Sequence, residues 1–201
     1  MLRVAITQAQ IQLHKRGETR DTLDVRWGQM LSELNYLILP LMPSAMNSHA
    51  KFKHMQIDAI ILSGGGNVDD GSPREQLEKS LLTYSAAHNI PLLGICRGMQ
   101  MINDHQDGRL IKLPNHVKKR HDIFYSHDKN CIKRVVNSYH EYCITPASLG
   151  RNLEVLARAE DDTIECIKHV TYPWLGIMWH PEREKSFDTF DLSLIKNHLG
   201  G

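Results

Sequence analysis

The 201-residue sequence has few cysteines, no long apolar run and almost no net charge. Its cysteines form no CxxC pair, which argues against both a disulfide framework and a thiolate zinc site. No apolar run is long enough for a membrane span, and the N-terminal run is too short for a signal peptide. The formal net charge of +1 gives no broad field for nucleic acid or for an anionic membrane. We therefore expect a cytoplasmic protein with neither as a partner.

The composition that is present fits one folded domain over residues 1–201. Hydrophobic residues make up 41% of the chain and charged residues 23%, which is ordinary for a globular protein, and no repeat or linker divides it. Apolar runs predict buried strands that alternate with helix-period segments, as in βαβ units. These runs cover residues 4–7, 36–41, 57–62 and 92–95. After Gly108, short extended runs predict antiparallel strands at 109–113, 122–125, 131–136, 154–159 and 163–169.

Three helices have readable signals. The first has an inner face of Leu23, Trp27, Met30, Leu31 and Leu34. The second begins at Ser72-Pro73-Arg74-Glu75, where a capping serine, a proline at the first helical position and a glutamate form a capping box. The last, over residues 187–199, is expected to be capped by Ser186 and to bury Phe190 and Leu194.

The segment Gly94-Ile95-Cys96-Arg97-Gly98 follows an apolar run and opens a helix-like stretch. This is the pattern of a nucleophile elbow with cysteine in the serine position. Glycines on either side of Cys96 allow a tight turn that exposes the thiol, and amides at the helix start favour a thiolate and an oxyanion. We expect Cys96 to be a nucleophile, and the alternative is an inert packed cysteine.

A base and an acid occur together at His180-Pro181-Glu182, after the apolar run 174–179. Residues two apart in an extended segment point to the same side. Glu182 can therefore hold one imidazole nitrogen of His180 and leave the other for the thiol. The order nucleophile, histidine, acid argues against α/β-hydrolases, whose order is serine, acid, histidine. The alternative is an ordinary surface strand end.

The glycine run Gly64-Gly65-Gly66 follows one predicted strand as Cys96 follows another. The carboxyl ends of parallel strands share one edge, so the two loops should be neighbours. The amide of Gly65 or Gly66, together with that of Arg97, is expected to form an oxyanion hole, and the sequence leaves open which glycine donates. The alternative is a glycine-rich turn without a ligand.

Together these blocks resemble the class I glutamine amidotransferases, and more closely their γ-glutamyl hydrolase branch. The resemblance covers essentially the whole chain and rests on residues 62–66, 94–100, 137–140 and 176–182, in the family's order. It implies a flavodoxin-like three-layer α/β fold, with a mostly parallel central sheet, helices on both faces and additional antiparallel strands. It also implies attack of Cys96 on the γ-carbonyl of a glutamine-like amide. His180 would protonate the leaving nitrogen and activate water, and Glu182 would hold the ring.

The resemblance further implies a γ-glutamyl site. Gln100 matches a residue that helps hold the glutamyl group in the family. Ser138, Tyr139 and His140 match a segment whose backbone binds the glutamyl amino and carboxylate groups. The alternatives are a helix-surface glutamine and a strand-end turn.

Five other polar residues raise further possibilities. His116, His121 and His127 offer imidazoles for a metal, but they lie in a polar stretch without helical ligand spacing. We therefore expect no metal and no cofactor. Arg20 and Arg74 can be placed against a phosphate or a distal part of a substrate, although solvated arginines are the expected interpretation.

Arg97 after the nucleophile resembles stand-alone γ-glutamyl hydrolases, since synthase-linked amidotransferases usually have leucine or a similar residue there. Residues 6–8, residues 20–24 and Trp27 look most like the small enzymes of capsular polysaccharide loci that cleave γ-glutamyl-CDP-amidate to cytidine diphosphoramidate and glutamate. The expected partner is then a small γ-glutamyl substrate, whether free or nucleotide-linked, and a homodimer stays open.

Two other functions remain as alternatives. They are a glutaminase subunit that delivers ammonia to a synthase and a hydrolase of another γ-glutamyl amine such as γ-glutamyl-GABA. A redox protein with a cysteine elbow is disfavoured, because such a protein would lack the His180-Pro181-Glu182 block. Two departures from the family pattern bear on the substrate beyond the scissile bond. Asp107-Gly108 stands where relatives often have two glycines, and Glu141-Tyr142 stands where an amide-rich segment is common.

Overall fold

The computed structural model describes residues 1–45, 49–113, 116–127 and 130–200. The strands, in chain order, are β1 (Arg3–Thr7), β2 (Ala9–Leu13), β3 (Glu18–Thr22), β4 (Leu37–Leu41), β5 (Ala59–Leu62), β6 (Leu92–Ile95), β7 (Ile111–Lys112), β8 (Val117–His127), β9 (Asn130–Tyr139), β10 (Tyr142–Cys143), β11 (Leu153–Ala159), β12 (Ile164–His169) and β13 (Trp174–Ile177). The α-helices are α1 (Val25–Glu33), α2 (His49–Met55), α3 (Pro73–His88), α4 (Arg97–His105) and α5 (Thr189–Leu199). Short 3-10 helices are η1 (His14–Arg16), η2 (Pro146–Ser148) and η3 (Pro181–Arg183).

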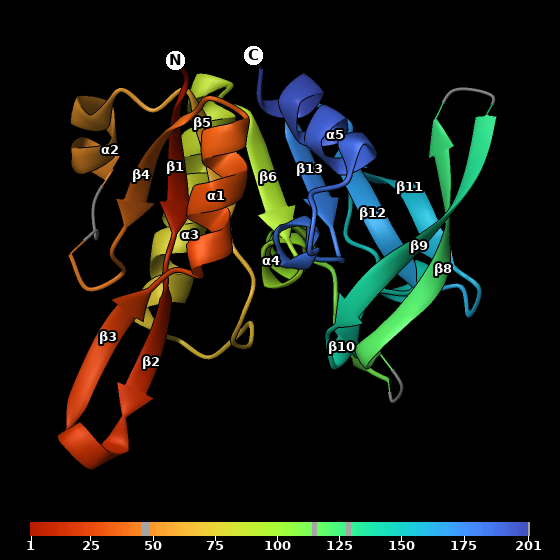
Figure 1. Cartoon of the computed structure of the whole chain (residues 1–201), viewed down its shortest axis with the longest axis horizontal. Coiled ribbons are helices and arrows are strands. Elements are labelled where there is room, and N and C mark those ends of the chain that lie inside the picture. The colour runs from red at the N-terminus through yellow and green to blue at the C-terminus, as the bar shows by residue number, and fades with distance from the viewer. Residues whose placement is uncertain (46–48, 114–115, 128–129, 201) are drawn as a thin grey trace.

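The main sheet has the strand order β4-β1-β5-β6-β13-β12-β11-β8-β9 (Figure 1). Neighbours from β4 to β13 are parallel, and the strands from β12 to β9 continue the sheet in antiparallel pairs. Every residue of β5, β6 and β13 is buried, as expected of parallel strands covered on both faces. The predicted mixed sheet with a parallel core is confirmed.

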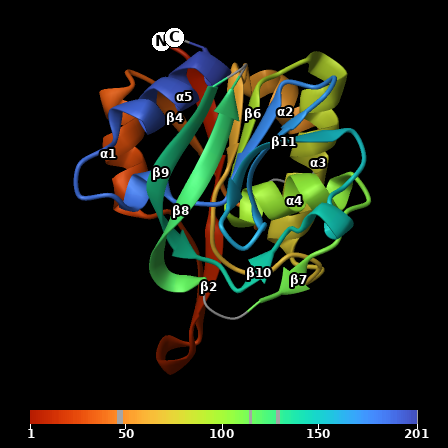
Figure 2. The same ribbon diagram turned by 90° about the vertical axis from the view of Figure 1, so that its right-hand side faces the viewer.

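Helices cover both faces of the parallel region. Figure 2 shows α1 and α5 on one side of the sheet and α2, α3 and α4 on the other. The helix α3 begins as predicted, because the Ser72 hydroxyl accepts from the amide of Glu75 and Pro73 occupies the first position. It ends at Asn89, which adopts the left-handed conformation. The layered α/β fold is thereby confirmed.

The last helix differs from its prediction at its start. Asp188, rather than Ser186, caps α5, because its carboxylate accepts from the amides of Phe190 and Asp191. The helix consequently starts at Thr189. Its buried apolar residues are Ile195 and Leu199, whereas Phe190 and Leu194 are only half-buried.

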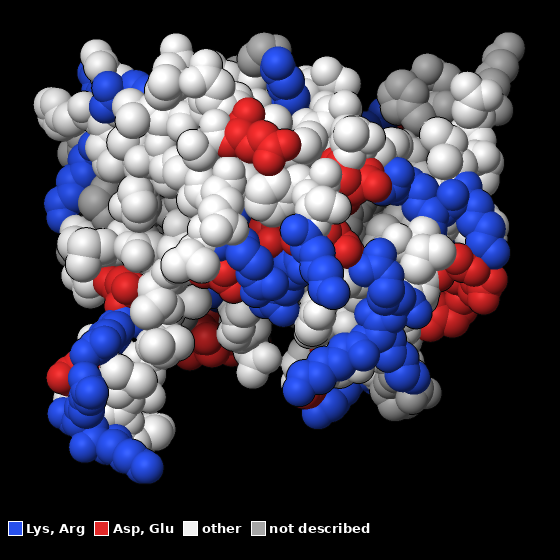
Figure 3. Space-filling model, in the orientation of Figure 1, with Lys and Arg blue, Asp and Glu red and all other residues white. Residues whose placement is uncertain are grey.

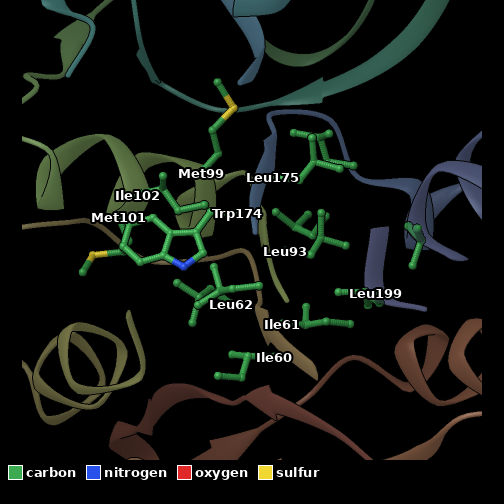
Figure 4. Close-up of a cluster of buried hydrophobic side chains, with 14 of the residues drawn as sticks. Ile60, Ile61, Leu62, Leu93, Met99, Met101, Ile102, Trp174, Leu175 and Leu199 are labelled. Carbon is green, nitrogen blue, oxygen red and sulfur yellow. The ribbon is translucent and has the colours of Figure 1, made fainter. Parts of the chain in front are cut away.

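The core lies on both sides of the parallel strands. Figure 4 shows side chains of β5, β6 and β13 gathered with residues of α4. The helix α4, which begins directly after Cys96, is therefore held in place by packing against these strands as well as by its connection to β6. Labelled members of this cluster are Ile60, Ile61, Leu62, Leu93, Met99, Met101, Ile102, Trp174, Leu175 and Leu199.

A hairpin that the sequence did not predict leaves the body of the molecule after β1. Its strands β2 and β3 pair from Ala9–Thr22 to Leu13–Glu18, and Gly17 at their turn has φ of 63°. Figure 1 shows it projecting away from the sheet, on the side where the carboxyl ends of the parallel strands lie. The hairpin therefore borders the edge at which a ligand would collect in such a sheet.

Candidate active site

The elbow at Cys96 is built by close backbone packing. Cys96 joins β6 to α4 with φ of 51° and ψ of −101°, a conformation unfavourable for a residue with a side chain. A Cβ atom at Gly94 would lie 2.4 Å from the carbonyl carbon of Gly98, and one at Gly98 would lie 2.2 Å from the carbonyl oxygen of Leu62. Both positions therefore require glycine. The predicted exposure of the thiol is wrong, since only 7% of the accessible surface of Cys96 is exposed.

Parallel pairing of β6 with β13 brings His180 to this elbow. The amide of Cys96 donates to the carbonyl of Ile177 at 2.8 Å, and His180 follows β13 by three residues. Nδ1 of His180 lies 2.7 Å from Oε1 of Glu182, and both residues are buried. The structure thus places the three predicted catalytic residues together, in the order thiol, imidazole, carboxylate.

The side chain of Asn137 holds the backbone of His180 in place. Its amide nitrogen donates to the carbonyl of His180 at 2.8 Å, and its oxygen accepts from the amide of His180 at 2.9 Å. Asn137 lies on β9, so the antiparallel part of the sheet positions a histidine at the edge of the parallel part. Sequence reasoning placed this residue in a family block without giving its side chain a role.

The pKa of His180 is raised to about 9. Burial by itself would lower that pKa, but hydrogen bonds to Cys96 and Glu182, together with their negative charges, outweigh the burial. The ring is therefore protonated at neutral pH. A positive charge beside the sulfur favours the thiolate form of a cysteine.

The glycine loop after β5 lies against the same histidine. A Cβ atom at Gly64 would lie 2.5 Å from Cε1 of His180, so only glycine fits there. Gly65 and Gly66 adopt φ of 92° and 77°. The loop and the elbow are thus neighbours, as predicted. The oxyanion role of Gly65, Gly66 and Arg97 stays a prediction.

A buried ion network, which the sequence did not reveal, fixes this loop. Arg74 is buried, so its predicted solvated state is wrong, and its guanidinium donates to the carbonyls of Ser63, Gly64 and Gly65 at 2.5 to 3.2 Å. Nε of Arg74 also lies 2.9 Å from Oε1 of Glu78, which is fully buried. The arginine therefore uses its donors on the loop's own backbone and on α3.

The side chain of Arg97 joins the same network and does not face the site. It forms an ion pair with Glu78 and donates from Nε to the carbonyl of Asn67 at 2.7 Å. Burial, with the nearby charge of Arg74, lowers the pKa of Arg97 to about 9. Thr7 also donates to Glu78, at 2.9 Å. The network ties β1, α3, α4 and the glycine loop together.

The predicted substrate-binding residues divide into two groups. Tyr139 is 39% exposed. Its ring meets that of His180 edge-on, with the ring centres 5.7 Å apart, and the guanidinium of Arg183 lies 4.7 Å from the centre of the same ring. Ser138 and His140 are buried and lie on the other face of the chain, because successive residues of an extended segment alternate. The hydroxyl of Ser138 donates to the carbonyl of His116 at 2.5 Å. Side chains at 138 and 140 therefore point away from His180.

Gln100 is buried one turn into α4. Its amide nitrogen donates to the carbonyl of Tyr142 at 2.9 Å, which links the nucleophile helix to the segment after β9. The helix-surface alternative for Gln100 is therefore wrong. Its contact with a glutamyl group stays a prediction. Arg20 is exposed and pairs with Glu18 on the hairpin, as expected of a solvated arginine.

Buried histidines gather behind Tyr139. Two overlapping sets have ligand atoms within 4.8 Å of one another. Of the histidines proposed from the sequence, His116 and His121 belong to this cluster, and the side chain of His127 lies outside the described residues. The sets are His116, His140 and Cys143, and His116, His121 and Glu165.

Comparison with known proteins identifies the family of the chain. The family model for class-I glutamine amidotransferases matches residues 29–199. The chain belongs to the class-I glutamine amidotransferase family. Enzymes of this family act on amide carbon–nitrogen bonds, so the predicted family and the prediction of an enzyme are both confirmed.

Individual members of the family are similar over most of the chain. The chain is 36% identical to the γ-glutamyl-CDP-amidate hydrolase of Campylobacter jejuni subsp. jejuni, over 96% of this chain and 98% of that protein. It is 31% identical to anthranilate synthase component 2 of Cyanophora paradoxa, over 81% and 86% respectively. A crystal structure of a glutamine amidotransferase from Thermotoga maritima has a TM-score of 0.71 at 17% identity, over 98% of this chain and 84% of that one. Within the described residues, no helix is long and apolar enough to cross a membrane.

Proposed function

We propose that this amidotransferase-family chain hydrolyses a γ-glutamyl amide through a thioester on Cys96. The observation that carries the proposal is the buried His180, hydrogen-bonded on one side to Glu182 and on the other to Cys96. A thiol, an imidazole and a carboxylate in this order form a nucleophile, its base and the group that orients the base. The strained backbone at Cys96 supports a functional role, because strain of this kind collects at active sites.

The proposed reaction has two steps that restore the enzyme. The Cys96 thiolate attacks the γ-carbonyl carbon, and the carbon–nitrogen bond breaks as protonated His180 gives its proton to the leaving nitrogen. An amine-type product departs and a glutamyl thioester remains. Neutral His180 then takes a proton from water, the hydroxide attacks the thioester carbonyl, and the carbon–sulfur bond breaks to release glutamate. Amides of Arg97 and of Gly65 or Gly66 stabilise the oxyanion in both steps.

The γ-glutamyl group binds beside Tyr139 and Gln100 in this proposal. The backbone of residues 138–140 holds the amino and carboxylate groups. Gln100 supports this segment, because its bond to Tyr142 connects it to the helix that carries the nucleophile.

For the substrate we propose γ-glutamyl-CDP-amidate, cleaved to cytidine diphosphoramidate and glutamate during modification of a capsular polysaccharide. The 36% identity to a γ-glutamyl-CDP-amidate hydrolase over nearly the whole of both chains supports it. A cavity of about 550 Å³ between α1 and the segment after Glu182 contains Arg26, Arg183 and Lys185 in its lining, together with Glu33 and Glu184, and the basic side chains suit a diphosphate. Figure 3 shows Lys and Arg gathered over the β2–β3 hairpin, over the lower part of β8 and between them. All four cysteines are free, which fits a reducing cytoplasm.

A substrate panel tests this proposal. Purified protein is incubated with glutamine, γ-glutamyl amines including γ-glutamyl-GABA, and γ-glutamyl-CDP-amidate, and kcat/KM is compared. We expect the nucleotide-linked substrate to be cleaved best, Cys96→Ala to be inactive, and His180→Asn to lose about a hundred- to ten-thousandfold. Mass spectrometry of the wild-type protein, quenched with acid after a short incubation, should detect the glutamyl adduct on Cys96. Cleavage by Cys96→Ala at the wild-type rate would exclude the thioester route.

A glutaminase subunit is the second candidate, favoured by the 31% identity to anthranilate synthase component 2. It predicts weak release of ammonia from free glutamine and a gain when a synthase partner is added. The same panel separates the two functions. Preferred cleavage of glutamine would replace the hydrolase proposal with this one.

A further inference from the structure

A second group of titratable side chains lies outside the proposed catalytic residues, behind Tyr139. Glu165 on β12 is fully buried, and its two carboxylate oxygens face imidazoles at 3.4 Å (Nε2 of His121) and 3.5 Å (Nε2 of His140). Neither oxygen, and neither of these nitrogens, has a hydrogen-bond partner within the part of the chain that the structure describes. A buried carboxylate is costly unless a positive charge lies beside it, so either a protonated imidazole or a bound cation must supply that charge.

The contacts made by one ring nitrogen of His116 and by one of His140 show which nitrogen of each ring is left as an acceptor. Nε2 of His116 lies 2.8 Å from Oδ2 of Asp161, and a carboxylate oxygen only accepts, so Nε2 carries the proton and Nδ1 is the free acceptor. Nδ1 of His140 lies 3.2 Å from the carbonyl of Tyr142, which in the same way leaves Nε2 as the acceptor. Both acceptors are buried and unpartnered. An imidazole whose far nitrogen is held by a carboxylate or a carbonyl is the usual arrangement around a protein-bound metal.

The distances between these ligand atoms also suit a bound metal ion. Ligand atoms of His116, His121 and Glu165 all lie within 4.8 Å of one another. With zinc–ligand bonds of about 2.0 to 2.1 Å, two ligands of a tetrahedral site are about 3.4 Å apart. The 3.4 Å separation between Nε2 of His121 and Oε2 of Glu165 therefore matches a tetrahedral edge, and the 3.5 Å separation places Nε2 of His140 against the other oxygen, Oε1. Both separations are longer than good charged hydrogen bonds between nitrogen and oxygen, which are about 2.7 to 2.9 Å.

We propose that His116, His121 and Glu165 bind one divalent transition-metal ion, best matched by Zn²⁺, while Nε2 of His140 faces the other oxygen of Glu165. Imidazole and carboxylate are suitable ligands for zinc, and the 20% exposure of the His121 side chain gives the ion a way in. Cys143 is not a ligand in this arrangement, because its sulfur lies 3.5 Å from Nδ1 of His140, on the other side of that ring.

The ion has a structural role, since its ligands are distinct from Cys96, His180 and Glu182. It joins the loop before β8, β8 and β12, and β8 pairs with β9, which carries both Tyr139 and the Asn137 that holds His180. Ser138 adds a further link through its bond to the carbonyl of His116. The site thus fixes the segment proposed to bind the γ-glutamyl group, and no step of the hydrolysis passes through the metal.

Metal content tests the inference independently of activity. The full chain carrying Cys96→Ala, so that the proposed nucleophile cannot bind the ion, is stripped with a chelator, mixed with equimolar Zn²⁺ or Co²⁺ and gel-filtered. We expect about one ion per chain by mass spectrometry, a tetrahedral Co²⁺ absorption band and a higher Tm with the ion than without it. A chain that retains no ion would overturn the proposal.

Variants locate the ion. His121→Ala and Glu165→Gln should lose it, whereas His14→Ala, at an exposed histidine of the hairpin, should retain it. Asp161→Asn removes only the outer partner of His116, at a carboxylate that is 51% exposed, and should lower the affinity about 10- to 100-fold without unfolding the chain. Cys143→Ser should bind the ion as tightly as the parent protein. Retention of the ion by His121→Ala, or its loss in Cys143→Ser, would show that the proposed ligand set is wrong.

Discussion

At the scale of single residues, the proposed chemistry depends most on His180. Its ring is almost fully buried, yet its pKa of about 9 keeps it protonated at neutral pH. In the proposed reaction, the proton that the leaving nitrogen needs is therefore already present before substrate arrives. This advantage depends on Glu182 and Cys96, because without their charges burial alone would favour the neutral ring.

The pH dependence of Glu182→Gln tests this balance. In the wild-type protein kcat/KM should fall as pH rises through about 9, because His180 loses its proton there. Glutamine removes one of the charges that raise the pKa of His180, so the alkaline fall should move to lower pH. The maximal rate should also drop, by on the order of a hundredfold. Profiles of kcat/KM from about pH 6 to 10 measure both effects, and an unmoved alkaline limb would contradict the assignment.

Gly64→Ala tests how closely the glycine loop approaches the histidine. The added methyl would lie 2.5 Å from Cε1 of His180, so either the ring or the loop must move. We expect kcat to fall at least tenfold with the fold retained, since small displacements of catalytic groups are costly. Gly28→Ala is the matched control, because nothing lies within 4 Å of its added Cβ in α1. It should keep full activity and gain up to about 1 kcal/mol of stability. Equal activity of both variants would contradict the predicted crowding.

At the scale of secondary-structure elements, one carboxylate organises the packing around the loop. Glu78 on α3 accepts from Thr7 of β1 and forms ion pairs with Arg74 of its own helix and Arg97 of α4. Arg74 in turn holds the glycine loop by its carbonyls. Removal of the charge on Glu78 would leave two buried guanidinium groups without their anion.

We therefore expect Glu78→Gln to lower the free energy of unfolding by about 3 to 5 kcal/mol, the usual cost of breaking a buried pair. Urea unfolding followed by circular dichroism measures it. Glu154→Gln is the matched control, because Glu154 pairs with Lys168 across exposed strands and should cost at most about 1 kcal/mol. Similar losses in the two variants would mean that the network contributes no more than a surface pair.

Elements differ in how far the sequence predicts them. The central strands and the elbow were predictable, because burial on both faces gives continuous apolar runs and Gly94 and Gly98 follow a local pattern. The β2–β3 hairpin was not, since it is largely exposed and its second strand, β3, contains no apolar residue. The ion pair of Arg97 with Glu78 and the cluster around Glu165 depend on segments 19 or more residues apart, whose contact is decided only by packing and strand register.

At the scale of the whole molecule, stability against pH depends on buried groups far from the proposed chemistry. Asp191 on α5 is 4% exposed and accepts from the indole nitrogen of Trp179 at 3.1 Å. Burial raises its pKa to about 6, against the weaker opposing effect of Arg134. Trp179 immediately precedes His180, so this contact helps to hold in place the segment after β13 that carries His180.

The raised pKa fixes the sign of the effect. Between about pH 4 and 6 the folded chain binds more protons at Asp191 than the unfolded chain, so its contribution to stability is fully present below about pH 4 and is lost as pH rises through about 6. Asp191→Asn keeps an oxygen for Trp179 without the charge, and should raise the free energy of unfolding at pH 7 by on the order of 1 kcal/mol. Urea unfolding at pH 4 and pH 7 measures it. The variant's advantage should be larger at pH 7 than at pH 4, and an equal difference at both would show that the carboxylate of Asp191 is not destabilised by burial.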